Sequence, residues 1–299
     1  MVKPAERETK NPMTEHSYSY YPGCSLHSTA KEFDVSTRLV CETLGIDLKE
    51  IDGWICCGAS AAHSTNHLLS LALPAYNIKL AEKAGLPIVA PCAMCYSRLK
   101  ITLHEVKNEE TGKLVEKAID DTIEDTVTVH SILDVLDLPI SESLMKKSLS
   151  GLKTACYYGC LLVRPQEITN IDDENNPQAM DQLVARFGAE SIPWGLKSEC
   201  CGASLPFARP DIVHKLSHRL LATAKRAGAD CIIAACPMCQ SNLDLQQKAI
   251  QEKYQEDLNL PIIYITQLVG LALGLSPEEL LLDKHFVDPR SLLSRKGLI

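Results

Sequence analysis

Ten of the thirteen cysteines in this chain of 299 residues form two sets of five with the same order along the sequence. Each set consists of a lone cysteine, an adjacent pair followed by Gly-Ala-Ser, and a Cys-x-Met-Cys motif. The segment between the pair and the last motif is 34 residues long in both sets (58 to 91 and 202 to 235). Thiolates are soft ligands for zinc and for iron–sulfur clusters, so the pattern predicts two equivalent metal centres that share one substrate. The first set is Cys24, Cys56, Cys57, Cys92 and Cys95, and the second is Cys160, Cys200, Cys201, Cys236 and Cys239.

Three kinds of chemistry use a Cys-x-x-Cys motif at a strand-to-helix turn. A redox-active dithiol would use the helix N-terminus to lower a thiol pKa, but it would leave the pair and the lone cysteine without a role. Structural zinc takes four tetrahedral ligands, one fewer than each set provides. A cubane iron–sulfur cluster also takes four cysteines, so five indicate an enlarged or irregular cluster. The spacing favours iron–sulfur binding and leaves zinc and the dithiol as alternatives.

The overall composition argues against several other classes of protein. Apolar residues make up 45% and charged residues 23%, as in an ordinary globular protein. A net charge of -8 disfavours a nucleic-acid partner, which would require a basic surface. The most apolar late stretch, Leu260–Leu275, is too short to span a bilayer, and Met1–His16 does not resemble a signal peptide. We expect a cytoplasmic protein without membrane insertion, whose cysteines are ligands rather than disulfide partners.

Aligning the two cysteine pairs reveals an internal repeat at an offset of 144 residues. In each copy a β-prone run ends at the lone cysteine, a helix ending at a glycine follows, and a longer helix comes after the cysteine pair. A short apolar strand then leads into the Cys-x-x-Cys motif, and a last strand leads into a capped helix. The expected strands are Tyr18–Tyr21, Pro87–Ala90 and Val127–Val129, then Thr154–Tyr158, Cys231–Ala235 and Ile262–Ile265.

The helices between these strands also follow from the pattern. We expect Val35–Leu44 and Ala179–Phe187 as the shorter helices. The longer helix of the second copy begins at Pro210, which suits a first-turn position. Its counterpart is expected to be capped by Ser64 or Thr65, bent at Pro74, and to reach Gly85. Eight extra residues of the second copy, around Ile168–Asn176, are polar and predict a loop.

This alternation predicts an α/β fold of two tandem-repeat parallel lobes related by internal duplication. We expect residues 1–16 to form an N-terminal tail, 17–150 the first domain, and 151–299 the second domain with a C-terminal extension. The lobes join near Leu144–Lys153. Ligands of open parallel sheets lie beyond the carboxyl ends of the strands, where both Cys-x-x-Cys motifs are expected. The strand order does not follow from the pattern.

The cysteine pattern resembles the tandem cysteine-rich "CCG" domains of the heterodisulfide reductase B-type family, over nearly the whole chain from Tyr18 to about Pro289. The segments Tyr20–His27 and Cys56–His63 are similar to the bacterial branch. The resemblance implies a non-cubane [4Fe-4S] cluster bound by each set of five cysteines, with no ligand missing. It also implies two partners, a C-type subunit with cubane [4Fe-4S] clusters and a flavin-containing A-type subunit.

The predicted function is that of an iron–sulfur catalytic subunit that reduces, or forms, a disulfide or related thiol-type substrate. Disulfide reduction takes two electrons and separates two sulfurs, so two clusters facing one cleft would each serve one sulfur. The chain has no ferredoxin-type cysteine run and no G-x-G-x-x-G phosphate loop, so electrons would be exchanged with a partner protein. An electron-relay or assembly subunit without a small-molecule substrate is the alternative, and a zinc-stabilised scaffold is a third.

Several residues near the motifs are further candidates. His63 and His27, and less so His67, could donate a proton to a leaving thiolate, although a surface histidine is the ordinary alternative. Three arginines that follow cysteine motifs could clamp an anionic substrate, although arginines are more often solvated. The remaining three cysteines are expected to be structural core residues. The arginines are Arg98, Arg164 and Arg209, and the cysteines are Cys41, Cys156 and Cys231.

Overall fold

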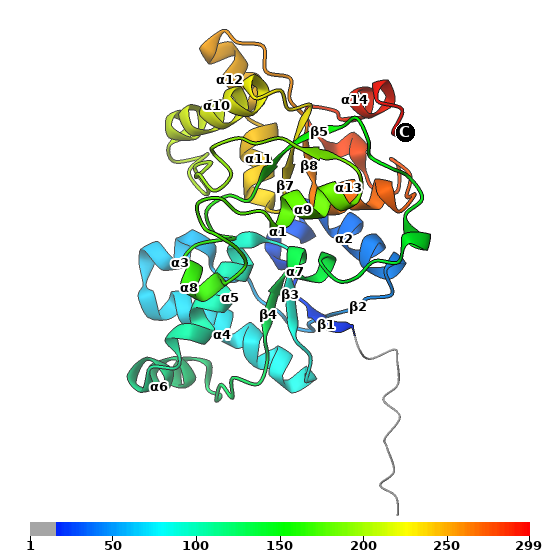
Figure 1. Cartoon of the computed structure of the whole chain (residues 1–299). Coiled ribbons are helices and arrows are strands. Elements are labelled where there is room, and N and C mark those ends of the chain that lie inside the picture. The colour runs from blue at the N-terminus through cyan, green and yellow to red at the C-terminus, as the bar shows by residue number, and fades with distance from the viewer. Residues whose placement is uncertain (1–15) are drawn as a thin grey trace, which may run out of the picture.

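The computed structural model describes residues 16–299, so the predicted N-terminal tail lies, apart from His16, outside the described residues. The chain forms two four-stranded sheets with the orders β2-β1-β3-β4 and β6-β5-β7-β8. All strand pairs are parallel. The equal order confirms two tandem α/β lobes related by duplication (Figure 1). The strands are β1 (Ser17–Tyr20), β2 (Asp47–Glu50), β3 (Ile88–Ala90), β4 (Val129–Ser131), β5 (Lys153–Tyr157), β6 (Glu190–Ser191), β7 (Cys231–Ala234) and β8 (Ile262–Tyr264).

Helices surround each sheet and connect its strands. The first lobe contains α1 (Gly23–His27), α2 (Lys31–Thr43), α3 (Ala59–Thr65), α4 (His67–Ala84), α5 (Ala93–Glu105), α6 (Glu109–Ile119) and α7 (Ile132–Leu136). The second contains α8 (Gln166–Thr169), α9 (Ala179–Arg186), α10 (Pro210–Arg226), α11 (Pro237–Asp244), α12 (Gln247–Tyr254), α13 (Ile265–Ala272) and α14 (Arg290–Arg295). Two short 3-10 helices, Glu142–Leu144 and Leu282–Lys284, complete the described elements.

The helices after the two cysteine pairs differ between the lobes. The predicted helix that reaches Gly85 is α4, and a separate short helix, α3, precedes it. Asn66 ends α3 and caps α4, because its side-chain oxygen accepts a hydrogen bond from Leu69 N at 2.9 Å. The predicted cap at Ser64 or Thr65 is therefore wrong. Pro74 lies inside α4, and α10 begins at Pro210 as predicted.

Two other local predictions have mixed outcomes. Ser131 caps α7, and Asp134 accepts a hydrogen bond from the Ser131 N–H at 2.7 Å, which confirms the capped last helix of the first copy. The polar insertion of the second copy is not a loop throughout, because its start belongs to the short helix α8. Tyr96 of α5 donates a hydrogen bond to the Thr169 carbonyl at the end of that helix, so the insertion packs against the first lobe.

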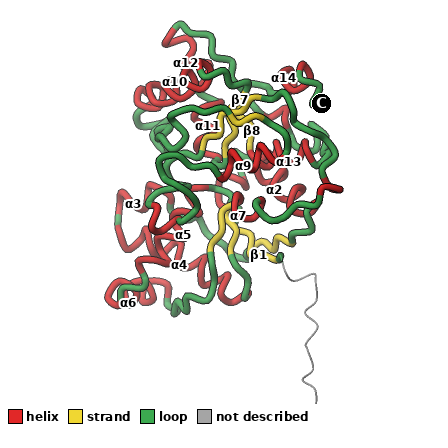
Figure 2. Tube along the Cα trace, in the orientation of Figure 1, coloured by secondary structure: helices red, strands yellow, loops and turns green. Residues whose placement is uncertain are grey.

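Helices α2 and α13 pack against each other between the two sheets, and this contact joins the lobes into one core (Figures 1 and 2). Phe33 of α2 stacks on Tyr264 with ring centroids 4.2 Å apart and planes 3° from parallel. Both side chains are fully buried. Next to them the hydroxyls of Ser36 and Thr266 hydrogen-bond at 2.7 Å. The relative position of the lobes is therefore fixed by buried, specific contacts.

Substituting Phe33 with alanine is expected to lower the free energy of unfolding by about 3–5 kcal/mol, because a buried aromatic side chain is removed from a filled interface. The urea midpoints of Phe33→Ala and of the control Phe207→Ala, each compared with that of the wild type, measure the change in the free energy of unfolding. Phe207 is fully exposed, so its loss should change the free energy by about 0.5 kcal/mol or less. Equal midpoints for the two variants would show that the stack does not join the lobes.

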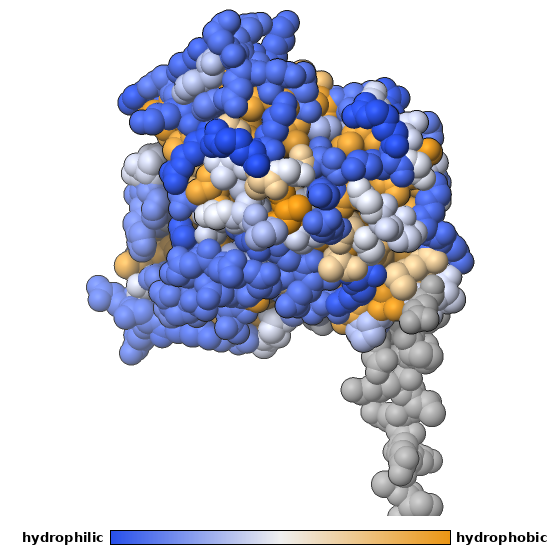
Figure 3. Space-filling model, turned by 45° about the horizontal axis from the view of Figure 1, so that its top comes forward, coloured by the Kyte–Doolittle hydropathy of each residue, from blue (hydrophilic) through white to orange (hydrophobic). Residues whose placement is uncertain are grey.

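The apolar segment Leu260–Leu275 is part of the interior of the second lobe. It forms β8 and α13, whose residues are all buried. No helix among residues 16–299 is both long and apolar enough to cross a membrane. The face of the molecule in Figure 3 is mainly hydrophilic, with scattered hydrophobic patches.

Candidate metal centre

The five predicted ligands of the first lobe lie together. Cys24 is in α1, Cys56 and Cys57 precede α3, and Cys92 and Cys95 lie at the start of α5. The sulfurs of Cys57 and Cys95 are 3.5 Å apart, and those of Cys24 and Cys56 are 3.8 Å apart. Side-chain hydrogen bonds also link Cys56 to Cys57 and Cys92 to Cys95. The structure thus connects all five thiols.

The second lobe repeats this arrangement. The sulfurs of Cys201 and Cys239 are 3.7 Å apart, matching the equivalent pair of the first lobe. Side-chain hydrogen bonds link Cys160 to Cys200 and Cys236 to Cys239. The charges of Cys201 and Cys236 also act on the Cys160 thiol, so the five cysteines of the second set lie together as well.

The two sets meet at the boundary between the lobes. The thiols of Cys92 and Cys236 lie close enough that their interaction is the largest cause of the raised pKa of Cys92. The hydroxyls of Ser60 and Ser204 hydrogen-bond at 2.5 Å. Both pairs consist of residues 144 apart, so equivalent positions of the repeat face each other. All ten cysteines therefore form one connected group of thiols.

The geometry of this group suits an assembly of several metal atoms. Two thiolates on one tetrahedral metal lie about 3.8 Å apart when each metal–sulfur distance is about 2.3 Å, close to the observed separations of 3.5 to 3.8 Å. Within residues 16–299, no three or more His, Cys, Asp or Glu side chains are arranged as ligands of a single ion. The thiols converge in pairs at separations that suit two thiolates on one metal atom.

Among the ten cysteines the pKa is lowered in four and raised in five, whereas it is raised in all of the other three. Hydrogen bonds from Cys56 and Cys95 lower the pKa of Cys57, and one from Cys160 lowers the pKa of Cys200 to about 6. Thiolates are the metal-binding form, so the sets contain groups that ionise readily. By contrast, burial alone raises the pKa of Cys41 to about 12.

The three cysteines outside the sets are fully buried, as predicted. Burial is also the main cause that raises the pKa of Cys156, to about 12, and that of Cys231. These thiols are core residues, and all thirteen cysteines are free.

A tyrosine in each lobe fixes the backbone that precedes the cysteine pair. The Tyr21 hydroxyl donates to the Ile55 carbonyl at 2.7 Å, and the Tyr157 hydroxyl donates to the Glu199 carbonyl at 2.7 Å. Each tyrosine lies three residues before the lone cysteine. These positioning residues were not predicted from the sequence, although the shared Tyr-x-Gly-Cys spacing was a usable signal.

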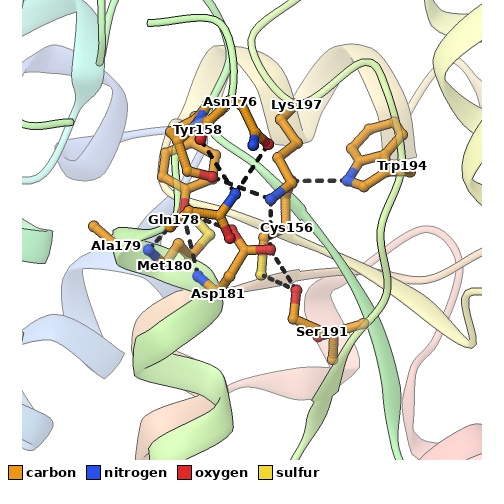
Figure 4. A network of polar contacts seen from close by, with 12 residues as sticks. Cys156, Tyr158, Asn176, Gln178, Ala179, Met180, Asp181, Ser191, Trp194 and Lys197 are labelled. Carbon is orange, nitrogen blue, oxygen red and sulfur yellow. Dashed lines mark hydrogen bonds and ion pairs between the residues drawn. The ribbon is translucent and has the colours of Figure 1, made fainter. Parts of the chain in front are cut away.

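A buried polar network supports the second set (Figure 4). The Lys197 ammonium pairs with Asp181 at 2.8 Å, and Asp181 also accepts a hydrogen bond from the Tyr158 hydroxyl at 2.7 Å. The Lys197 carbonyl accepts hydrogen bonds from the N–H groups of Tyr158 and Gly159. Burying an ion pair adds little net stability, so its effect here is geometric. It ties the chain before Cys160 to the loop that carries the second cysteine pair.

The three candidate histidines are exposed at the surface. His27 pairs with Glu50 at 3.0 Å and packs edge-on against Trp54. His63 and His67 are exposed on α3 and α4. The structure therefore gives His27 a surface partner and leaves His63 as an exposed side chain near the first pair.

Two of the three candidate arginines have other partners. Arg209 is exposed and pairs with Asp211 at 2.9 Å. Arg164 donates hydrogen bonds to Ser198 and to the Glu174 carbonyl, so it helps to hold the insertion against the second lobe. Arg98, on α5, is the one whose charge acts on a ligand thiol, that of Cys57.

A small hollow of about 20 Å³ lies over the second set and is lined from both lobes. Met94 and Met238, the central methionines of the two Cys-x-Met-Cys motifs, both face it. Its other lining residues are Ala93, Tyr157, Tyr158, Cys160, Leu161, Cys201, Ala203, Cys236 and Cys239. Thiols of the second set and residues of both lobes therefore line one hollow at the lobe boundary.

Comparison with known proteins identifies the domains. The family described as "Cysteine-rich domain" (CCG) matches residues 18–100 and 154–244, more than half of the chain. The chain belongs to this family. Each CCG copy covers the first three strands of one sheet, and the two copies contain all ten cysteines of the repeat. The fold and the resemblance predicted from the cysteine pattern are thus confirmed.

The similar curated proteins are components of reductases. A chain of Wolinella succinogenes named 8-methylmenaquinol:fumarate reductase membrane anchor subunit is 32% identical, covering 93% of this chain and 99% of that protein. The B-type components of the heterodisulfide reductases of Methanosarcina acetivorans and Methanosarcina mazei are 31% and 30% identical, each covering 93% of this chain and 96% of the relative. These CCG proteins support an iron–sulfur oxidoreductase subunit.

One solved structure shares the fold. A hypothetical protein from Helicobacter pylori superposes with a TM-score of 0.77 at 15% identity over 95% of this chain. This chain spans about half (55%) of that one. The likeness supports the two-lobed architecture alone.

Proposed function

We propose that the chain is the iron–sulfur catalytic subunit of a heterodisulfide-reductase-like complex, with residues 17–150 and 151–299 as its two domains. Each domain would hold one non-cubane [4Fe-4S] cluster. The ligands would be Cys24, Cys56, Cys57, Cys92 and Cys95 in the first, and Cys160, Cys200, Cys201, Cys236 and Cys239 in the second. The substrate would be a disulfide or a related thiol-type molecule bound between the lobes.

The observation that carries this proposal is the contact between Cys92 and Cys236 across the lobe boundary. It supports two centres close enough to act on one molecule, because the two ligand sets are continuous there. Disulfide reduction separates two sulfurs with two electrons. An iron–sulfur cluster bound at each set would supply one-electron transfer and an iron site able to hold a thiolate.

The protein's own residues would bind the substrate and control water. Cys57, Cys95 and Cys239 are buried, which keeps one side of each set dry, whereas Cys56 and Cys200 are exposed. The methionines and other apolar side chains around the hollow would orient a sulfur-containing substrate without competing charges. The exposed cysteines mark the side from which it would enter.

Electrons would be exchanged through a partner protein. We propose a C-type subunit with cubane [4Fe-4S] clusters as the direct partner and a flavin-containing A-type subunit beyond it. The relatives support this assembly, since they are named as subunits of reductases.

The proposal is tested by preparing the full chain without oxygen and measuring iron, acid-labile sulfide and zinc. We expect about eight iron atoms per chain, about four for each set. The reduced protein should then release thiols from a panel of small asymmetric disulfides. Zinc without sulfide would instead indicate a metal-stabilised scaffold and would contradict the proposal.

The second candidate is an electron-relay or assembly subunit without a small-molecule substrate. The Wolinella succinogenes relative favours it, because that protein is named a membrane anchor subunit of a methylmenaquinol:fumarate reductase. The same reduced chain separates the two functions. Release of thiols with saturation by the disulfide supports the catalytic subunit. A chain that contains both clusters but is reoxidised only by a partner protein or a naphthoquinone supports the relay.

A further inference from the structure

The two sets of cysteines are equivalent, but their charged surroundings are not. The offset of 144 residues that relates the lobes places Arg98 and Asn242 at the same position. Arg98 follows Cys95 by three residues on α5, and Asn242 follows Cys239 by three residues on α11. On a helix this spacing places two side chains on the same face. Each residue therefore lies beside its own set.

The contacts of Asn242 show what this position touches. Its side-chain amide donates to the Cys201 sulfur at 3.5 Å and to the Ala203 carbonyl at 2.9 Å, and the residue is fully buried. A neutral amide thus faces the thiol of the second pair. The equivalent thiol in the first lobe is that of Cys57.

Arg98 brings a full positive charge to the same place. Its Nε is buried and has no hydrogen-bond partner among residues 16–299. Burial lowers the pKa of Arg98, but an arginine stays protonated in proteins. Arg98 and the Cys57 thiol lie close enough for their charges to interact.

A second pair of equivalent residues also differs in charge, and again the second lobe has the less positive surroundings. Ile55 and Glu199, also 144 apart, directly precede the two cysteine pairs. Their carbonyls accept the same tyrosine hydrogen bond at 2.7 Å, so the backbone geometry is shared. Glu199 places an exposed carboxylate beside the second set, where the first set has an apolar side chain. Solvent screens this charge, so its effect is smaller than that of Arg98.

We infer that Arg98 in the first lobe, against Asn242 and Glu199 in the second, makes the first-lobe centre the easier of the two to reduce. The inference rests on the proposed function, since it requires a cluster in each set. Reduction adds a negative charge, which a nearby cation stabilises and a nearby carboxylate opposes. A chain that carries a single electron therefore holds it in the first lobe. Arg98 acts as a positioning and tuning residue, not as a ligand.

The test is a redox titration of the anaerobically prepared full chain, followed by electron paramagnetic resonance. We compare the wild type with Arg98→Asn, Arg98→Lys and Asn242→Arg, and measure iron and sulfide in each. Arg98→Asn should shift the reduction equilibrium of the first-lobe centre by roughly tenfold towards the oxidised form, about 59 mV for one electron. Asn242→Arg should shift the second-lobe centre in the opposite direction by a similar factor.

Arg98→Lys separates charge from structure, because it keeps the positive charge and changes the shape. If charge sets the reduction potential of the first-lobe centre, that potential in Arg98→Lys should stay near the wild-type value. Full clusters with unmoved potentials in both Arg98→Asn and Asn242→Arg would overturn the inference and leave the proposed function intact. A wild-type chain without iron and sulfide would overturn both.

Discussion

A Cys57→Ser chain is expected to bind about half of the iron of the wild type and to lose at least about 100-fold in disulfide-reducing rate. Serine is a poor ligand for a cluster that thiolates hold, and Cys57 lies 3.5 Å from Cys95 at the buried side of the set. Without one of the two centres, a reaction that transfers two electrons and separates two sulfurs would have a single metal centre. Iron and sulfide per chain, with the rate at saturating disulfide, measure the effect.

The repeat provides a mirror variant and a matched control. Cys201→Ser should lose the other half of the iron, because Cys201 contacts Cys239 as Cys57 contacts Cys95. Cys231→Ala removes a buried thiol five residues before Cys236 but outside both sets, so it should retain the iron. Full iron content in Cys57→Ser and Cys201→Ser would show that these residues are not ligands.

The central strands were predictable because their apolar composition indicates that they are buried. Cys231–Ala234 and Ile88–Ala90 are short apolar runs, buried throughout, as expected for strands covered on both faces. Two of the four edge strands, β2 and β6, were not predicted. β2 has the sequence Asp-Leu-Lys-Glu and is mostly exposed, and β6 has two residues. These strands form by backbone pairing with β1 and β5. Such pairing leaves no apolar pattern in the sequence from which it could be predicted.

The two sets of cysteines could be recognised in the sequence, whereas their meeting point could not. Spacing and repetition identify ten cysteines, but the contact between Cys92 and Cys236 depends on how the lobes pack. That packing is determined by buried contacts such as Phe33 on Tyr264. The surface partner of Arg209, Asp211, also depends on the folded structure.

Duplication preserved the thiols while their neighbours diverged. In both lobes a tyrosine hydroxyl fixes the carbonyl before the cysteine pair. In the second lobe the buried Lys197–Asp181 pair lies behind the ligand loops. In the first lobe Tyr20, at the end of β1, donates instead to Asp34, which pairs with the half-exposed Arg38. Equal ligands in unequal surroundings suit two centres with different tasks.

Gly159→Ala is expected to empty the second set and to reduce the iron content by about half. Gly159 has φ +67°, and a Cβ there would lie 2.9 Å from the Cys239 sulfur. The sulfur could escape only by rotating away from Cys201 and Cys236, and that movement would break the set. Gly23→Ala should do the same in the first set, where φ is +69° and the Cys95 sulfur would be 2.8 Å away. Iron, sulfide and the disulfide-reducing rate measure both.

Backbone strain alone cannot account for such a loss of iron. A third variant, Gly85→Ala, separates the effect of strain from the effect of the contact with sulfur. Gly85 has φ +66°, with no atom within 4 Å of an added Cβ. Its substitution carries the left-handed strain of about 1–2 kcal/mol without the contact to sulfur. Gly85→Ala should therefore lower the urea midpoint and keep the full iron content, whereas Gly159→Ala and Gly23→Ala should lower both. Full iron in all three variants would mean that the glycines do not make room for the ligand sulfurs.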